Sequence, residues 1–271
     1  MENIKQILKH KKFLPSKKMG QNFLSNPLVI DEICEHIPSL DNYDCVLEIG
    51  PGLGAITEYL VNTHKPIICI ELDKRLYADL KQKFKKYTNL NLINNDFLEV
   101  DLSTLTKPYK NVIVVANIPY SITTPIVLKC MEFSKIKTLY IMVQKEVAEK
   151  WVYSKTSNRN AATNIINFYF DMKKIMNIKN TSFTPAPKVD SAMVLLNKKD
   201  DKVYDPNFYK FIRPFFLAKR KKLLNNLPVG ISKDKILPLL IEFGFDANVR
   251  AEALDYNHWW RLYQTFKQYE D

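Results

Sequence analysis

A glycine-rich turn between an apolar strand and a helical pattern is the feature that most constrains the fold of this chain. Cys45–Ile49 has the composition of a buried strand, Gly50-Pro51-Gly52-Leu53-Gly54 follows it, and Ala55–Val61 has helical spacing. Glycine permits left-handed backbone conformations, and its missing side chain lets a ligand approach the amides at the start of a helix. The unit predicts an α/β fold with a nucleotide-like ligand at the turn.

Two other interpretations of this turn remain open at this point. Gly50, Gly52 and Ala55 also fit a loose dinucleotide-binding fingerprint, and any tight turn with positive φ favours glycine. A second motif, Asn117-Ile118-Pro119-Tyr120, follows a later apolar strand. A nicotinamide-dependent dehydrogenase has no use for this motif, whereas an enzyme that acts on a nucleobase amine does.

Apolar runs alternate with helical patterns up to about residue 200. The predicted helices are 26–37, 55–61, 75–86 and 125–133, and the predicted strands are Cys45–Gly50, Pro66–Leu72, Leu90–Asn95, Asn111–Asn117, Thr138–Val143, Lys174–Lys179 and Ala192–Asn197. Runs such as Val112–Val115 are apolar throughout, which is typical of strands buried on both faces of a mostly parallel sheet. The last two strands should pair antiparallel at one edge.

The pattern changes after Asp201. No further strand is convincing, and helices are predicted at Asn207–Leu224, Lys233–Phe243 and Tyr256–Tyr269. We therefore predict a basic N-terminal arm over residues 1–20, a Rossmann-like α/β domain over 21–200 and a small all-helical domain over 201–271 that docks on it.

Composition excludes several classes of protein. Of the 271 residues, 46% are hydrophobic and 25% are charged, which excludes a disordered chain, and no apolar run approaches the roughly 20 residues needed to cross a bilayer. The net charge of +11 favours a polyanionic partner, although lysines can also simply cover solvated faces. The scattered cysteines and the lack of a signal or transit peptide predict reduced core thiols in the cytoplasm.

Polar residues stand at successive strand ends, where ligands bind in open α/β sheets. Gly50 follows the first strand, Glu71 ends the second, and Asp96 follows the third. Glu71 can accept hydrogen bonds from both ribose hydroxyls of a nucleoside, and Asp96 can accept from an adenine amine while Phe97 or Leu98 covers the ring. A single acidic residue at a strand end is more often a helix cap. Polar residues at several successive strand ends, however, favour a nucleoside site.

The motif at Asn117–Tyr120 makes the predicted reaction specific. An adenine N6 amine is a weak nucleophile because its lone pair is delocalised into the ring, so an enzyme must position it. The Asn117 side-chain oxygen and the Ile118 carbonyl can accept its two N–H bonds, Pro119 stiffens the turn, and Tyr120 can stack on the base. This chemistry needs no metal, and the histidines form no cluster in the sequence. The alternative is a polar turn after a buried strand.

With these motifs, the chain resembles the KsgA family of rRNA adenine dimethyltransferases, which use S-adenosylmethionine, over nearly its whole length. Further motifs that carry the resemblance are Gly20–Leu24, Glu71-x-Asp73, Val143–Ala148, Phe183–Ser191 and Lys219–Leu227. Small departures are Ser25-Asn26, where an acidic residue is expected, and Ile118, where Leu or Pro is commoner. The resemblance implies a Rossmann-like class I methyltransferase domain followed by a helical rRNA-docking domain.

The resemblance also implies roles for particular residues. The cofactor S-adenosyl-L-methionine would be bound by Gln21, Asn22, Leu24, Gly50, Gly52, Glu71, Leu72, Asp96, Phe97 and Asn117. The catalytic residues would be Asn117, Ile118, Pro119, Tyr120 and Phe183. Of these, Phe183 would stack on the far side of the target adenine. In the helical domain, rRNA phosphates would be contacted by Arg213, Lys219, Arg220, Lys221 and Lys222. Alternatively, these cations form the outer face of an amphipathic helix.

The implied activity is methylation of N6 on two adjacent adenosines in the 3′-terminal hairpin of 16S rRNA during ribosome biogenesis. The implied partner is the small ribosomal subunit, and we expect a monomeric protein. One alternative is an Erm-type large-subunit rRNA methyltransferase, although Gly50–Gly54 lacks the Lys-Gly-His-Phe turn of that group. The other is a noncatalytic ribosome assembly or RNA-binding factor, against which the intact Asn117–Tyr120 motif argues.

Overall fold

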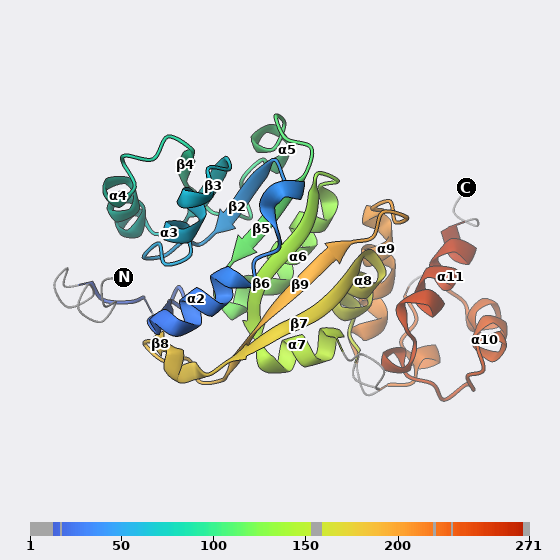
Figure 1. Ribbon diagram of the computed structural model, residues 1–271. Helices are drawn as coiled ribbons and strands as arrows, with labels where there is room; N and C mark the ends of the chain where they lie inside the picture. Colours follow the sequence, from blue (N-terminus) through green and yellow to red (C-terminus); the bar gives the residue numbers. More distant parts are fainter. Residues whose placement is uncertain (1–12, 17, 153–158, 219–220, 229, 268–271) are drawn as a thin grey trace. The chain divides into compact units, whose positions relative to one another are not determined.

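The computed structural model describes residues 13–16, 18–152, 159–218, 221–228 and 230–267. These residues form two compact units (Figure 1). The first contains the chain up to Ala148 together with Met172–Lys198, and the second contains Glu149–Asp171 together with the chain from Lys199 onward. The second unit therefore includes a segment, Glu149–Asp171, that lies inside the range we expected for the α/β domain.

A seven-stranded sheet with the order β4-β3-β2-β5-β6-β9-β7 is the centre of the first unit. Its strands are β2 (Cys45–Ile49), β3 (Ile67–Glu71), β4 (Leu90–Asn94), β5 (Val112–Ala116), β6 (Ile136–Gln144), β7 (Phe170–Ile178) and β9 (Ser191–Lys198). Strands β2 to β6 pair in parallel, and β9 pairs antiparallel with β6. This confirms the predicted mostly parallel sheet, with β9 and β7 at one edge.

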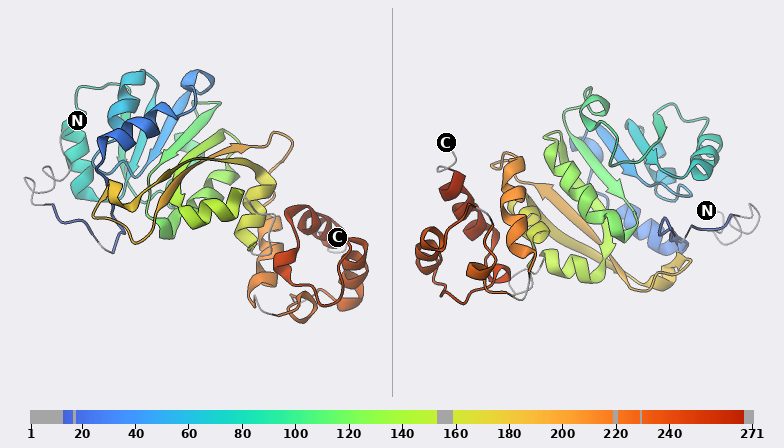
Figure 2. Two further views of the ribbon diagram at one scale, coloured as in Figure 1. Left: turned by 60° about the horizontal axis from the view of Figure 1, so that its bottom comes forward. Right: turned by 180° about the vertical axis from the view of Figure 1, so that it is seen from behind.

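Helices lie on both faces of this sheet (Figures 1 and 2). The helices of this unit are α2 (Pro27–Glu35), α3 (Thr57–Leu60), α4 (Lys74–Lys83), α5 (Leu102–Leu105) and α6 (Thr123–Glu132), and α7 (Lys145–Val152) runs from the first unit into the second. Ile33 of α2 and Leu60 of α3 share a buried cluster with Val46 and Tyr140 of the sheet, and α6 lies on the opposite face (Figure 2). Because alternate strand residues point to opposite faces, a sheet covered on both sides requires continuous apolar strands.

Local capping signals explain where two of these helices begin. The Asn26 side chain accepts a hydrogen bond from the Leu28 N–H at 3.1 Å, and Pro27 occupies the first helical position. Asp73 accepts from the Arg75 N–H at 2.9 Å and so begins α4 directly after β3. Such caps each contribute about 1 kcal/mol and fix the start of a helix. The α4 cap also places an acidic residue beside the end of β3.

The second unit is helical and is built around aromatic side chains. Its helices are α8 (Ala161–Tyr169), α9 (Pro206–Ile212), α10 (Lys233–Glu242) and α11 (Tyr256–Lys267). The rings of Phe168 and Trp260 stack with centroids 4.6 Å apart, and Phe215 lies 5.0 Å from Trp259. In the described ranges no helix is long and apolar enough to cross a membrane.

The predicted continuous helix Asn207–Leu224 is wrong. Helix α9 ends at Ile212, and a 3₁₀ turn, Arg213–Phe216, replaces the next part of it. Pro214 explains the change because proline lacks an N–H donor and its ring clashes with the preceding helical turn. As a result, Lys221 and Lys222 lie in an irregular segment before a second 3₁₀ turn, Leu223–Asn225.

Candidate functional site

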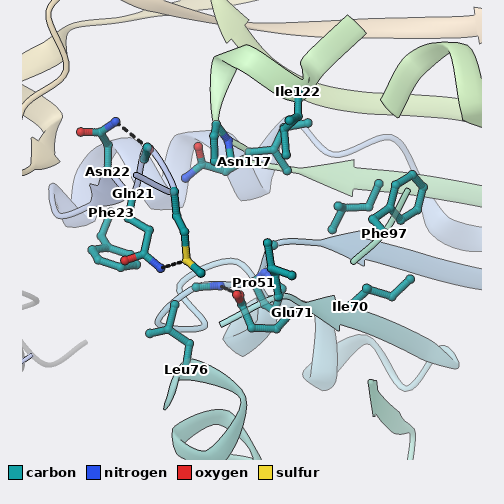
Figure 3. A pocket seen from close by; sticks show the side chains of 18 of the residues that line it. Gln21, Asn22, Phe23, Pro51, Ile70, Glu71, Leu76, Phe97, Asn117 and Ile122 are labelled. Atoms are coloured by element: carbon teal, nitrogen blue, oxygen red, sulfur yellow. Dashed lines mark hydrogen bonds between the residues drawn. The ribbon is translucent and has the colours of Figure 1, made fainter. Parts of the chain in front are cut away.

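A cavity of about 460 Å³ lies in the first unit, at the carboxyl ends of its parallel strands (Figure 3). This volume is typical of a site for a small ligand or cofactor. The cavity is lined by all residues predicted to bind the cofactor, by Asn117–Tyr120 and by Phe183. The fold therefore brings together residues that are separated by up to about 160 positions in the sequence. Their individual roles stay predictions.

The glycine turn between β2 and α3 forms one wall of this cavity. Gly52 has a φ of +61°, and its amide donates a hydrogen bond to Glu71 Oε2 at 3.0 Å. Gly54 has a φ of +78°, and a Cβ atom there would lie 2.7 Å from the Phe84 ring. The left-handed backbone conformation favours glycine at both positions, and the packing against Phe84 also requires it at Gly54. The turn is therefore fixed to the end of β3 and to α4.

Glu71 lies at the end of β3, on the side of the cavity opposite Asn117 (Figure 3). It is 5% exposed, and its Oε1 accepts a second hydrogen bond from the Asp73 N–H at 2.8 Å. Burial raises the pKa of this carboxyl group, and the two amide hydrogen bonds oppose that change. A carboxylate has about four acceptor positions. Glu71 can therefore hold the turn and still accept hydrogen bonds from ligand hydroxyls.

The segment after β4 forms the next wall. Asp96 is half-buried, and its Oδ1 accepts a hydrogen bond from the Leu98 N–H at 2.8 Å. Phe97 is buried, whereas Leu98 and Leu72 are partly exposed beside the cavity. The Asp96 carboxylate and the apolar side chains of Phe97, Leu98 and Leu72 thus line the same cavity, which is an arrangement suited to a flat heterocycle with an amine.

Asn117 follows β5, and its side chain points into the cavity (Figure 3). Within the part of the chain that the structure describes, this amide makes no hydrogen bond to protein, so its oxygen can accept one from a ligand. Tyr120 is anchored, because its hydroxyl lies 2.5 Å from the hydroxyl of Ser191 at the start of β9. Burial raises the pKa of Tyr120 above its ordinary value, so the phenol is neutral.

A short two-stranded sheet brings the N-terminal segment to the same cavity. Strand β1 (Phe23–Leu24) pairs antiparallel with β8 (Phe183–Thr184), so that Leu24 lies opposite Phe183. Phe183 is 4% exposed and belongs to the buried cluster that also contains Leu24. Its proposed stacking on a substrate base therefore remains a prediction.

Gln21 and Asn22 line the cavity from this segment (Figure 3). The Gln21 amide donates to Asp73 Oδ2 at 3.0 Å, and its oxygen accepts from the Ser16 N–H at 2.8 Å. Asn22 donates to the Gly20 carbonyl at 3.1 Å. A hydrogen-bonded Arg75 lowers the pKa of Asp73 to about 2, so Gln21 contacts an ionised carboxylate. The contact between Gln21 and Asp73 was not predicted, although both residues belong to motifs that the sequence contains.

Sequence reasoning also missed the role of Glu48 within its own motif. This residue is 3% exposed, and its Oε2 accepts hydrogen bonds from the Thr57 hydroxyl at 2.7 Å and the Cys69 thiol at 3.1 Å. Burial raises its pKa to about 7. Glu48 thus connects β2, β3 and α3 beneath the glycine turn.

The four cysteines are free and buried, as predicted.

The predicted RNA-binding cations belong to the second unit. Arg213, Lys221 and Lys222 are exposed, and Lys222 donates to Asn248 Oδ1 at 2.5 Å. Lys219 and Arg220 lie outside the described residues. Lys221 and Lys222 are not on a helix, so they do not form the outer face of an amphipathic helix. Their contact with phosphates stays a prediction.

The sheet order, the glycine turn and the polar strand ends together define a Rossmann-like methyltransferase. The sequence model of the family described as "Ribosomal RNA adenine dimethylase" matches residues 13–268. The chain belongs to this family.

Curated relatives agree with this assignment. A ribosomal RNA small subunit methyltransferase A from Ureaplasma parvum serovar 3 is 43% identical over 93% of this chain and 94% of its own length. The protein of the same name from Fusobacterium nucleatum is 39% identical over 94% of this chain and 98% of its own length. The similarity to both relatives thus extends over nearly the whole of this chain and of theirs.

Solved structures support the fold in both units. A dimethyladenosine transferase from Plasmodium falciparum has a TM-score of 0.73 at 25% identity, covering 91% of this chain and 98% of its own. The 23S rRNA methyltransferase ErmE has a TM-score of 0.68 at 25% identity, and the match covers 90% of this chain and 98% of ErmE. Because a dimethyladenosine transferase and a 23S rRNA methyltransferase share this fold, the fold alone does not identify the substrate.

Proposed function

We propose that this protein transfers methyl groups from S-adenosylmethionine to N6 of two adjacent adenosines in the 3′-terminal hairpin of 16S rRNA. One observation carries the proposal: Asn117, with an amide that is not bonded to protein in the described residues, faces a cavity lined by the acidic strand ends. The family assignment and the small-subunit relatives support the target.

The acceptors in the cavity support S-adenosylmethionine as the cofactor. Glu71 would accept the ribose hydroxyls, Asp96 would accept the adenine amine, and Phe97, Leu72 and Leu98 would enclose the ring. When bound, the cofactor supplies an electrophilic methyl group on a sulfonium. Gly50 and Gly52 line the cavity without side chains, so the cofactor could approach their backbone closely.

The catalytic motif would act by positioning the target amine. The Asn117 side-chain oxygen and the Ile118 carbonyl would accept its two N–H bonds and direct the nitrogen lone pair toward the methyl group. Tyr120 and Phe183 would hold the base by stacking once it has left the RNA helix. Held in this way, the nitrogen would take the methyl group that the bound cofactor supplies, with the sulfide as leaving group, and would then pass its proton to water. The protein's contribution is geometry, without a strong base.

The same site would methylate each nitrogen twice. After the first transfer the nitrogen retains one N–H, so one of the two acceptors loses its partner. The base would then depend more on stacking by Tyr120 and Phe183. Release and rebinding between the two transfers would let the remaining N–H take either acceptor.

The second unit would contact the small ribosomal subunit through Arg213, Lys221 and Lys222, together with Lys219 and Arg220. We further propose that the protein acts as a monomer in the cytoplasm, where its substrate particle is assembled. A noncatalytic assembly factor is disfavoured because the motif and the cavity are both intact.

The test uses small subunits and large subunits from a strain that lacks the gene. Each is incubated with the protein and S-adenosylmethionine, and the rRNA digests are analysed by mass spectrometry. We expect dimethyladenosine at two adjacent positions near the 3′ end of 16S rRNA. Methylation of 23S rRNA alone would instead support the Erm-type alternative, and binding without product would support an assembly factor.

A further inference from the structure

Lys129, in the last turn of α6, holds the segment that follows β4. Its ammonium donates to the carbonyl oxygens of Leu98 and Val100, both at 2.7 Å. The same nitrogen lies 5.6 Å from the centroid of the Phe97 ring. Hydrogen bonds from a charged donor are roughly twice as strong as neutral ones. One side chain therefore fixes a stretch of backbone that carries no regular secondary structure of its own.

That stretch contains the adenine side of the proposed cofactor site. Asp96, Phe97 and Leu98 all line the cavity. The Leu98 N–H donates to Asp96 Oδ1 at 2.8 Å, while the Leu98 carbonyl accepts from Lys129. The backbone of a single residue thus connects the carboxylate to the ammonium. Movement of Leu98 would change the direction of the Asp96 carboxylate.

The position of β4 explains why this support is needed. β4 is the edge strand of the sheet, so β3 supports it on one side only. On that side, Asn94 Nδ2 donates to the Glu71 carbonyl at 2.7 Å. Beyond the end of the strand, Lys129 of α6 holds the following segment through the carbonyls of Leu98 and Val100. Edge elements open more easily than central ones, so such anchors set local geometry.

We propose that Lys129 is a positioning residue that holds Asp96 in place to accept the exocyclic amine of the cofactor's adenine. This inference rests on the proposed function. Helix α6 begins at Thr123, directly after the catalytic motif, and ends beside the adenine segment. The helix therefore connects the catalytic motif to the segment that carries Asp96, with Lys129 as the contact to that segment.

Lys135 provides a matched control. Its ammonium donates to the carbonyl oxygens of Lys107 at 2.7 Å and Thr106 at 3.2 Å, so it fixes the next loop with the same chemistry. Neither Thr106 nor Lys107 lines the cavity. Loss of Lys135 should therefore affect folding in the same way as loss of Lys129, but it should leave the cavity unchanged.

The experiment measures binding of two ligands by calorimetry. One is S-adenosylhomocysteine, and the other is its analogue in which hydrogen replaces the 6-amino group of the purine. For Lys129→Met, we expect binding of S-adenosylhomocysteine to weaken about tenfold and binding of the analogue to change less than about twofold, because only the first ligand uses Asp96. Lys135→Met should bind both ligands like the wild type.

Lys129→Arg keeps a charged donor, so this variant should bind S-adenosylhomocysteine with most of the wild-type affinity. It is the second variant to be measured if Lys129→Met does not fold. If a Lys129 variant lost the same affinity for both ligands, Lys129 would support the cavity as a whole and not Asp96 in particular. If the affinity for S-adenosylhomocysteine were unchanged, Lys129 would have no part in positioning Asp96. Either result overturns the inference. If the wild type bound neither ligand, the proposed function itself would fail.

Discussion

At the scale of single residues, the two polar groups that face each other across the cavity differ in how they are held. Glu71 already accepts hydrogen bonds from the amides of Gly52 and Asp73. Asn117, by contrast, has no such partner in the described ranges and projects from the end of a buried strand (Figure 3). The structure thus separates a residue that shapes the site from one whose acceptor remains open to a ligand.

Glu71→Ala should weaken binding of S-adenosylmethionine by about 1–3 kcal/mol, because charge-assisted hydrogen bonds to the ribose are lost. Calorimetry measures this directly. Glu58→Ala is the control, since Glu58 is an exposed carboxylate on α3 that pairs with Lys83 at 3.1 Å. An unchanged affinity in a folded Glu71→Ala variant would remove Glu71 from the site.

Tyr120→Ala should cost about 1–3 kcal/mol of base stacking, whereas Tyr120→Phe should remain partly active because the ring is retained. The Phe variant still loses the hydrogen bond to Ser191 that orients the ring. Ser191→Ala should therefore reduce methyl transfer to a similar extent, and the double variant should be no worse than either single one. Additive losses in kcat/KM would show that the two hydroxyl groups act independently.

At the scale of elements, the sequence predicted which residues lie at the carboxyl edge of the sheet. It did not predict the hydrogen bonds between those residues. The continuous apolar runs indicated strands such as Cys45–Gly50 and Asn111–Asn117, and topology then places their ends together. The contacts from Glu71 to Gly52 and from Gln21 to Asp73 join distant segments, so no local pattern reports them. The wrong helix after Asn207 has a local cause, because the apolar spacing continues past Pro214 while the backbone does not.

The buried Glu48 predicts a pH dependence of stability. Burial raises its pKa in the folded protein to about 7, above the ordinary value of 4.5. The folded state therefore keeps a proton between these values that the unfolded state releases. This contribution is complete below about pH 4.5 and is lost as pH rises through 7, with a total of about 3 kcal/mol.

Urea unfolding of the wild type and Glu48→Gln from pH 5 to 8 tests this prediction. The free energy of unfolding of the wild type relative to the variant should fall across the range, because the neutral amide does not titrate. A difference that stays constant with pH would show that Glu48 ionises normally in the folded protein.

At the scale of the whole molecule, the net charge of +11 overstates the surface available for RNA. Several lysines hold the fold together: Lys198 donates to the carbonyls of Cys130, Met131 and Phe133, and Lys129 and Lys135 make similar contacts. Composition alone could not separate these lysines from the exposed cations of the second unit. The structure makes that separation for the residues it describes.

Arg213→Glu combined with Lys221→Glu should weaken binding to small subunits and leave S-adenosylmethionine binding intact. The salt dependence should flatten by roughly one unit of slope for each phosphate that the variant no longer neutralises. Filter binding over a salt series measures both effects. The control is Lys81→Glu with Lys85→Glu, which makes the same change in net charge at exposed residues of the first unit. Equal weakening by both pairs would indicate a general charge effect in place of docking.

The central claim is that Asn117 positions a nucleobase amine for methyl transfer. The most direct measurement is the rate of methyl transfer to undermethylated small subunits by the wild type and by Asn117→Ala, with S-adenosylmethionine and RNA binding measured in parallel. We predict that the wild type makes dimethyladenosine, that the variant is slower by about two orders of magnitude or more, and that RNA binding changes little. A folded Asn117→Ala protein that methylates at the wild-type rate would contradict the account.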